Sequence, residues 1–290
     1  MSEMKQAGGG GQNPHTTEPG APQLTEQERK DVEERGAPRT EVVYEAIREE
    51  GESELKRSAS ALAWDGLAAG LSMGFSLAAE GLLRSHLPDA PWRPLVAKLG
   101  YAVGFLIIVL GRQQLFTENT LTVVLPLLQR PDAKTLGRVA KVWSVVLAAN
   151  LAGALLFAWV AGHTEIFRHE TRVAFAEIGR EALEGWWWTY FLRGVFAGWL
   201  IALMVWMLPA AETARFFVVV AMTYLVALAG LAHIVAGSID VLYVVTTGGA
   251  PWSAYFGWMI PALAGNVVGG TALVAALGHA QVVNEPEQEG

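Results

Sequence analysis

The strongest constraint on the fold is a long apolar region that carries few charges. Residues 58–284 hold 12 acidic and 13 basic side chains, whereas residues 1–57 hold 13 and 8. A helix needs about 20 predominantly apolar residues to cross a bilayer. The region contains six stretches of roughly that kind, at residues 59–83, 95–112, 142–162, 188–209, 216–235 and 255–279. We therefore predict an all-α integral membrane protein with six transmembrane helices.

The composition excludes several classes of protein. There is no cysteine, which excludes a disulfide scaffold, a thiolate metal site and a cysteine nucleophile. The nearly neutral apolar region offers no basic field for phosphate, so no nucleic-acid partner is expected. It also contains no pattern of metal ligands and no nucleophile–base pair, so we expect neither an enzyme nor a cofactor.

The two ends of the chain are predicted to lie outside the membrane domain. Residues 1–57 read as a cytoplasmic N-terminal tail, disordered over 1–37 because its polar, Gly- and Pro-rich sequence cannot bury enough surface. A short amphipathic helix is expected over 40–55, lying at the membrane surface or against the body of the protein. It is interpreted as a solvated lead-in, with a gate or plug as the alternative. Residues 58–280 are predicted to form the transmembrane domain, and 281–290 the C-terminal tail.

Two of the apolar stretches are interrupted by polar residues. Residues 94–129 would form a helix of about 54 Å, too long for one span and too short for two. The middle of this stretch, Arg112–Thr120, is polar. Residues 213–246 are interrupted in the same way by His233, Gly237 and Asp240. Irregular backbone at membrane depth is tolerated only where protein buries it or where it lines a polar cavity. Both stretches are therefore predicted to be broken helices that mark a binding or permeation site.

The two halves of the region resemble each other. Thr117 precedes Asn150 by 33 residues, and His233 precedes Asn266 by the same 33. Three spans per half place the halves in opposite orientations, because an odd number of crossings returns the chain to the other side of the membrane. We therefore predict a 3+3 inverted repeat. Coincidence among the small residues of membrane helices is the alternative.

Four sequence motifs resemble those of the formate/nitrite transporter family, in order over residues 58–280. They are Leu115-Phe116-Thr117, the run Asn150–Phe157 after Trp143, Ala232–Ala236, and Ile260–Gly270. The resemblance implies an aquaporin-like fold and a homopentamer with one pore per subunit. It also implies passage of small monovalent anions or their conjugate acids, among which formate, nitrite, hydrosulfide, lactate and acetate are the family's known cargo.

The chain departs from the family pattern at several positions. Trp186–Trp188 stand where the family often has a vestibule lysine, and Ala202 stands where it usually has an asparagine in the fourth helix. Gly237 replaces the asparagine expected after the fifth-helix histidine. Glu118 replaces a small polar residue in the first break. These changes leave the identity of the cargo open.

His233 is the main candidate functional residue, with Thr117, Leu115 and Phe116 as further pore residues. Moving a bare anion through an apolar constriction is costly, because the charge is desolvated without compensation. A histidine has an ordinary pKa near 6.5 and can offer a proton at physiological pH. A weak acid that takes or shares that proton would cross as a neutral molecule, while Thr117 hydrogen-bonds it from the opposite break.

Asn150 and Asn266 carry amides suited to the unpaired backbone groups of the breaks, and Gly237 is placed with them as structural support. Glu118 is a further pore residue, and an ionised carboxylate there would repel an anionic cargo. We expect it either to pair with Arg112 across the bend or to lie exposed in a wet vestibule. Asp240 is a candidate cap for a half-helix.

The sequence thus predicts a passive or proton-coupled channel for small monovalent anions or their weak acids. The partners would be that small solute, the lipid bilayer and four further copies of the chain. A neutral-solute pore and a non-transporting scaffold or sensor are the alternatives, and an integral-membrane enzyme is the weakest option. The basic loop 130–141 favours cytoplasmic termini in a bacterial inner membrane.

Overall fold

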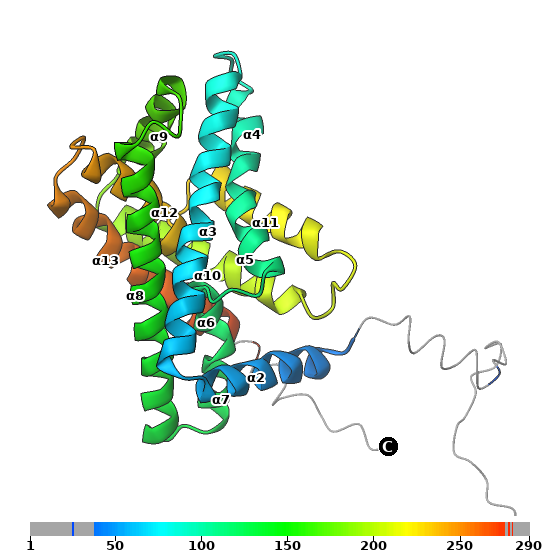
Figure 1. The fold of residues 1–290 in the computed structure, drawn as a ribbon. Helices are drawn as coiled ribbons and strands as arrows, with labels where there is room; N and C mark the ends of the chain where they lie inside the picture. Colours follow the sequence, from blue (N-terminus) through cyan, green and yellow to red (C-terminus); the bar gives the residue numbers. More distant parts are fainter. Residues whose placement is uncertain (1–24, 26–37, 276–277, 279, 281–290) are drawn as a thin grey trace, which may run out of the picture. The chain divides into compact units, whose positions relative to one another are not determined.

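The computed structural model describes residue 25, residues 38–275, and residues 278 and 280. The predictions of a disordered segment over 1–37 and of a tail over 281–290 therefore lie outside the described residues, Thr25 excepted. Every regular element of the described part is helical (Figure 1). The elements are α2 (Thr40–Lys56), α3 (Ala59–His86), α4 (Arg93–Ala97), η1 (Lys98–Tyr101), α5 (Ala102–Leu110), α6 (Phe116–Thr122), α7 (Val124–Gln129), α8 (Ala133–His163), α9 (His169–Ala182), α10 (Trp187–Met207), α11 (Arg215–Leu228), α12 (Ile234–Thr246), α13 (Trp252–Val268) and the π-helical η2 (Gly269–Ala275).

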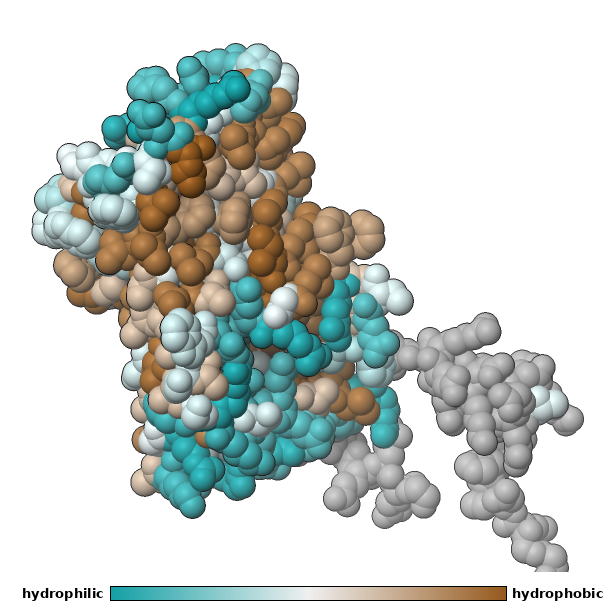
Figure 2. All heavy atoms as spheres, viewed as in Figure 1, coloured by the Kyte–Doolittle hydropathy of each residue, from teal (hydrophilic) through white to brown (hydrophobic). Residues whose placement is uncertain are grey.

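Four helical segments are long and apolar enough to cross a membrane. They are Ala59–His86, Arg93–Leu110, Ala133–His163 and Trp187–Met207, and α11 and α12 are shorter apolar helices. In the space-filling view a hydrophobic band separates hydrophilic side chains at the two ends of the helical body (Figure 2). Such a band is what the hydrocarbon core of a bilayer requires of a protein that spans it.

Both predicted helix breaks are present. The first lies between the end of α5 at Leu110 and the start of α6 at Phe116, and the second between Leu228 of α11 and Ile234 of α12. The second half of the polar stretch Arg112–Thr120, predicted to be irregular, is instead helical as part of α6. The span predicted over 216–235 ends as a continuous helix at Leu228.

The two helices that enter the breaks end in the same way. Arg112 and Gly230 adopt left-handed backbone conformations, with φ of 51° and 59°. In both cases the N–H of the next residue donates to the carbonyl five residues earlier, from Gln113 to Ile108 O at 3.0 Å and from Leu231 to Val226 O at 3.0 Å. This is the Schellman arrangement, which satisfies carbonyls at a helix C-terminus. The chain then continues in an extended conformation to the next half-helix.

The amphipathic helix predicted over 40–55 is α2, and it packs against the body of the protein. Its buried face, which includes Val43, Tyr44 and Ile47, forms an apolar cluster with Leu121 and Leu125 of the α6–α7 segment. In Figure 1, α2 and α7 lie at one end of the helical body, and α4 and α9 lie at the other.

Close backbone contacts join α3 to α8 and α10 to α13. A Cβ atom added at Gly70 would run into the carbonyl oxygen of Asn150, and one added at Gly198 would run into that of Asn266. Small residues allow two membrane helices to approach this closely. The two asparagines are thereby held against the first long helix of each half.

We predict opposite effects for the same substitution at two helical glycines. Gly198→Ala should lower the melting temperature in detergent, because overpacking costs about 1–3 kcal/mol in a close-packed contact. Gly257→Ala, in α13, meets no atom within 4 Å. It should leave the melting temperature unchanged or raise it, since alanine favours a helix interior by about 0.5–1 kcal/mol. Equal shifts in the two variants would contradict this account of the packing.

Candidate functional site

The centre of the site is a buried contact between the two breaks. His233 is the N-cap residue of α12, with extended backbone at φ −84° and ψ 124°. Its Nδ1 accepts the N–H of Ala236 at 3.1 Å, and its Nε2 lies 2.8 Å from Thr117 Oγ1 in the first turn of α6. Both side chains have no exposed surface. The structure therefore brings together the two polar residues that the sequence placed in separate breaks.

These contacts define the tautomer of the neutral imidazole. Because Nδ1 accepts a backbone hydrogen bond, the ring proton belongs on Nε2, which donates to Thr117 Oγ1. Thr117 keeps its own hydroxyl proton as a donor. The ring of Phe105 packs edge-to-face on the imidazole, with 5.0 Å between ring centroids. His233 thus presents a fixed N–H inside an otherwise apolar contact.

Asn150 of α8 holds the first break. Its Oδ1 accepts the N–H of Phe116 at 2.9 Å, and its Nδ2 donates to Gln114 O at 2.9 Å and to Gly66 O of α3 at 2.7 Å. One fully buried amide therefore satisfies the last carbonyl of the irregular segment and the first N–H of the half-helix. Its supporting position is as expected.

Asn266 of α13 makes the same three contacts in the second break. Its Oδ1 accepts the N–H of Ile234 at 2.9 Å, and its Nδ2 donates to Ala232 O at 2.7 Å and to Gly194 O of α10 at 3.0 Å. By these contacts Ile234 corresponds to Phe116, so His233 corresponds to Leu115.

Thr117 and His233 therefore do not occupy corresponding positions in the structure, although each precedes its asparagine by 33 residues. The hydrogen bonds span 34 residues in the first half and 32 in the second. The asparagine must reach the first N–H of the half-helix, so its position follows the helix start and not the polar residue nearby. Thr117 lies two residues beyond the position that corresponds to His233.

The remaining predicted pore residues are buried beside this contact. Leu115 is the N-cap residue of α6, and Phe116 packs edge-to-face on Trp143 at 5.9 Å; neither has exposed surface. Gly237 donates its N–H to His233 O at 2.9 Å. A Cβ at Gly237 would meet the indole of Trp258, so glycine is required there for close packing.

The ion pair considered for Glu118 and the cap considered for Asp240 are both absent from the described residues. Among the described residues Glu118 forms no ion pair, with Arg112 or any other cation, and its Oε1 is buried without a hydrogen-bond partner. Arg112 ends the α5 turn, whereas Glu118 lies on the other side of the break within α6. Asp240 does not cap a half-helix, because it lies in the interior of α12 and His233 provides the cap.

A cavity of about 330 Å³, here called the α9 cavity, reaches the residues that flank His233. Ala232 and Gly237 line it, as do residues of α9. It contains a buried ion pair between Glu80 Oε1 and Lys98 Nζ at 2.6 Å. Sequence analysis missed this pair, because its members lie on separate helices, Glu80 on α3 and Lys98 at the start of η1; Glu80 is only 2% exposed.

A second cavity of about 320 Å³, here called the α2 cavity, lies at the first break. It is lined by residues from α2, from the break, from α6 and from the start of α11. The lining residues that carry polar side chains are Glu50, Glu54, Arg57, Arg112, Gln113, Gln114, Glu118, Thr122 and Arg215.

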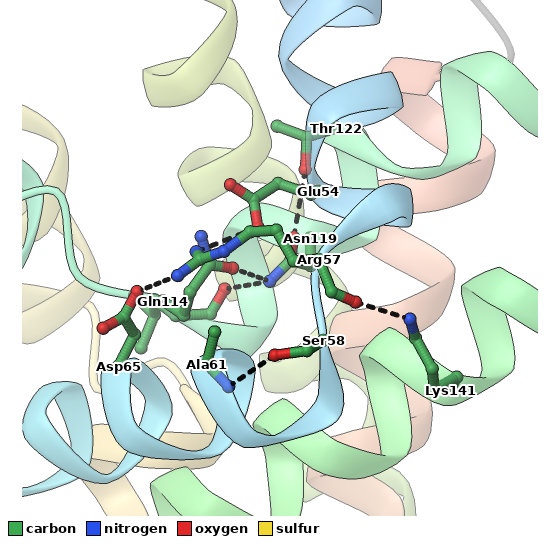
Figure 3. Close-up of polar contacts among 10 residues, drawn as sticks. Glu54, Arg57, Ser58, Ala61, Asp65, Gln114, Asn119, Thr122 and Lys141 are labelled. Atoms are coloured by element: carbon green, nitrogen blue, oxygen red, sulfur yellow. Dashed lines mark hydrogen bonds and ion pairs between the residues drawn. The ribbon is translucent and has the colours of Figure 1, made fainter.

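Ion pairs fix the wall that α2 contributes to this cavity (Figure 3). Arg57 pairs with Glu54 at 3.2 Å and with Asp65 of α3, and Lys141 of α8 donates to Arg57 O at 2.7 Å. The hydrogen bond that Arg57 donates to the Asp65 carboxylate raises the pKa of Arg57, and burial raises the pKa of Glu54. The sequence could not show this network, because its members lie on three helices.

The described residues contain no group of three or more His, Asp or Glu side chains that could hold a metal ion.

Comparisons with known proteins agree on one family. The sequence profile described as "Formate/nitrite transporter" matches residues 41–280. The chain is 44% identical to "Inner membrane protein YfdC" of Escherichia coli (strain K12), over 87% of this chain and 82% of that protein.

Two solved structures share the fold. One is titled "Pentameric formate channel with formate bound" (TM-score 0.64, 20% identity, 78% of this chain and 98% of that chain). The other is titled "FNT family ion channel" (TM-score 0.69, 17% identity, 84% of this chain and 99% of that chain).

We predict that Asn150→Leu lowers the free energy of unfolding by about 2 kcal/mol or more. It would leave the N–H of Phe116 and the carbonyl of Gln114 buried without partners, at about 1–3 kcal/mol for each group. The measurement is thermal unfolding in detergent. Thr223→Val is the control, because Thr223 is equally buried but its hydroxyl only adds a bond to Val219 O within α11. If Thr223→Val lowered the melting temperature as much as Asn150→Leu, the proposal that the Asn150 amide stabilises the break would be contradicted.

Proposed function

Because the chain belongs to the formate/nitrite transporter family, we propose that it is a membrane channel or transporter for a small monovalent anion or its conjugate weak acid. The observation that carries this proposal is the buried His233–Thr117 contact at two facing helix breaks, with a cavity beside each break. A cargo that passes between the cavities must replace the hydrogen bond between these two side chains.

Chemically, His233 supplies the polar group that an apolar constriction otherwise lacks. Its Nε2–H and the hydroxyl of Thr117 are two donors that an anionic oxygen can accept in place of their mutual bond. Proton transfer from Nε2 leaves a neutral ring only if Nδ1 first releases the Ala236 N–H and takes up a proton. The cargo then crosses as its neutral acid, which avoids the desolvation cost of a bare charge.

The corresponding geometry of the breaks supports a six-helix 3+3 inverted repeat of aquaporin-like fold. The first half would comprise α3, the broken helix from α4 to α7, and α8. The second half would comprise α10, the broken helix from α11 to α12, and α13 with η2. Three crossings in each half would reverse its orientation and bring the two breaks together at membrane depth.

Related proteins support the assembly and the location that we propose for the chain. A related solved structure is titled as a pentameric channel, so we propose a homopentamer with one pore per subunit. A relative is named an inner membrane protein, so we propose that this chain is a multi-pass inner membrane protein. The basic loop 130–141 supports cytoplasmic termini. The domains would be a tail over 1–57, the channel over 58–280 and a second tail over 281–290.

We predict that both His233→Phe and His233→Asn reduce pH-dependent weak-acid flux by about tenfold or more, a barrier increase of about 1.4 kcal/mol. Asparagine can keep the cap on the Ala236 N–H but has no titratable proton. The assay is uptake of formate, nitrite and acetate by proteoliposomes between pH 5 and 8, with the oligomer checked by size-exclusion chromatography.

Full flux in His233→Asn would remove the histidine from the mechanism. Parent protein that admits no acid at any pH would instead support the scaffold alternative. Solute swelling without any pH dependence would support a neutral pore.

A further inference from the structure

The α2 cavity concentrates buried polar atoms that lack partners. Six such side-chain atoms occur in the described part of the chain, and three of them belong to residues that line this one cavity. They are Gln113 Oε1, Glu118 Oε1 and Arg215 Nε. Two of the other three, on Glu80 and Arg84, belong to ion pairs and are compensated by charge. Buried polar atoms that lack both a hydrogen bond and an ion pair are therefore concentrated in the residues around this cavity.

Such groups are costly unless something binds to them. A buried donor or acceptor without a partner loses its hydration without replacement. Here two acceptors and one donor belong to residues of the break, of α6 and of α11 that line a single space of about 320 Å³. A small polar ligand that offers both a hydroxyl proton and a carbonyl oxygen would satisfy one of the acceptors and the donor.

We propose that Glu118, Arg215 and Gln113 form a binding subsite for a small carboxylic acid in which the cargo and Glu118 share one proton. The carbonyl oxygen of the acid accepts the Arg215 Nε–H, and the shared proton joins its other oxygen to Glu118 Oε1. Gln113 Oε1 accepts from a second donor, such as water. No covalent bond forms or breaks apart from the position of that proton. The inference rests on the proposed transport function and names the form of cargo that this cavity admits.

The other charged residues around Glu118 do not give the cavity an excess of positive charge. On α2, Glu54 pairs with Arg57, and Glu50 is exposed. Arg112, in the break, is exposed and forms no ion pair among the described residues. The lining therefore holds three carboxyl and three guanidinium groups in balance.

Without a shared proton, Glu118 and an anion repel each other. Two carboxylates that meet in one site cannot both stay ionised at low cost, so they hold one proton between them. An anion whose conjugate acid is fully dissociated cannot take part in that sharing. Nitrate is such an anion and, like formate, is small and planar, so the subsite should discriminate against nitrate in favour of formate.

The test compares nitrate and formate uptake by proteoliposomes containing full-length parent protein and variants at pH 6. We expect the nitrate-to-formate uptake ratio to rise about tenfold in Glu118→Gln, because the amide no longer repels the anion. Glu50→Gln is the matched control, since it removes the same charge from the same cavity at an exposed position. Its ratio should stay within about twofold of the parent.

Arg215→Met supplies a second measurement that does not depend on the Glu118 variant folding. It should raise the formate concentration for half-maximal uptake about tenfold, with no gain in nitrate uptake, because it removes the donor to the acid's carbonyl oxygen.

An unchanged ratio in Glu118→Gln, or an equal change in Glu50→Gln, would overturn the subsite while leaving the transport function intact. Unaltered formate uptake in Arg215→Met would overturn its role in the subsite. If the parent protein took up neither nitrate nor formate, both the proposed transport function and the proposed subsite would be contradicted.

Discussion

Two buried asparagine side chains are the interaction on which the site depends. A helix that stops within a membrane leaves backbone carbonyl and N–H groups that no water can satisfy. Asn150 and Asn266 each bind one of these groups on either side of a break and anchor the break to a neighbouring long helix. Because each amide lies against a glycine contact between helices, packing and hydrogen bonding support one another. Without these amides, the backbone groups at the breaks would be buried without hydrogen-bond partners, which would destabilise the breaks.

The functional chemistry follows from bringing the two breaks together. The same local geometry in both halves places Leu115 and His233 at corresponding N-cap positions, yet only the second position is polar. The asymmetry gives one half the imidazole and lets the other half supply Thr117 to meet it. The surrounding cavities carry buried and paired charges of both signs, so the protein offers a solute hydrogen-bonding groups and not a strongly positive funnel.

Much of this could be predicted from the sequence because membrane insertion imposes simple rules. The apolar runs predicted the long helices, and the polar interruptions predicted both breaks. The sequence also marked His233, Thr117, Asn150 and Asn266. It failed on contacts between side chains far apart in the chain. The ion pair expected between Arg112 and Glu118 is absent, Glu80 is buried against Lys98, and Arg57 joins three helices. Patterns along one segment do not specify such partners.

The sequence by itself determined that the chain is helical and apolar, where its helices break, and to which family its motifs belong. The tertiary structure decided which residue of one break meets which residue of the other, and in what protonation pattern. It also decided that the α2 helix helps to line a cavity whose other lining residues carry unpartnered polar atoms. The physical reason is that hydropathy and helix breaking are local properties of the chain. The partner of a buried polar group is instead set by how helices distant in sequence pack, and no local pattern records that.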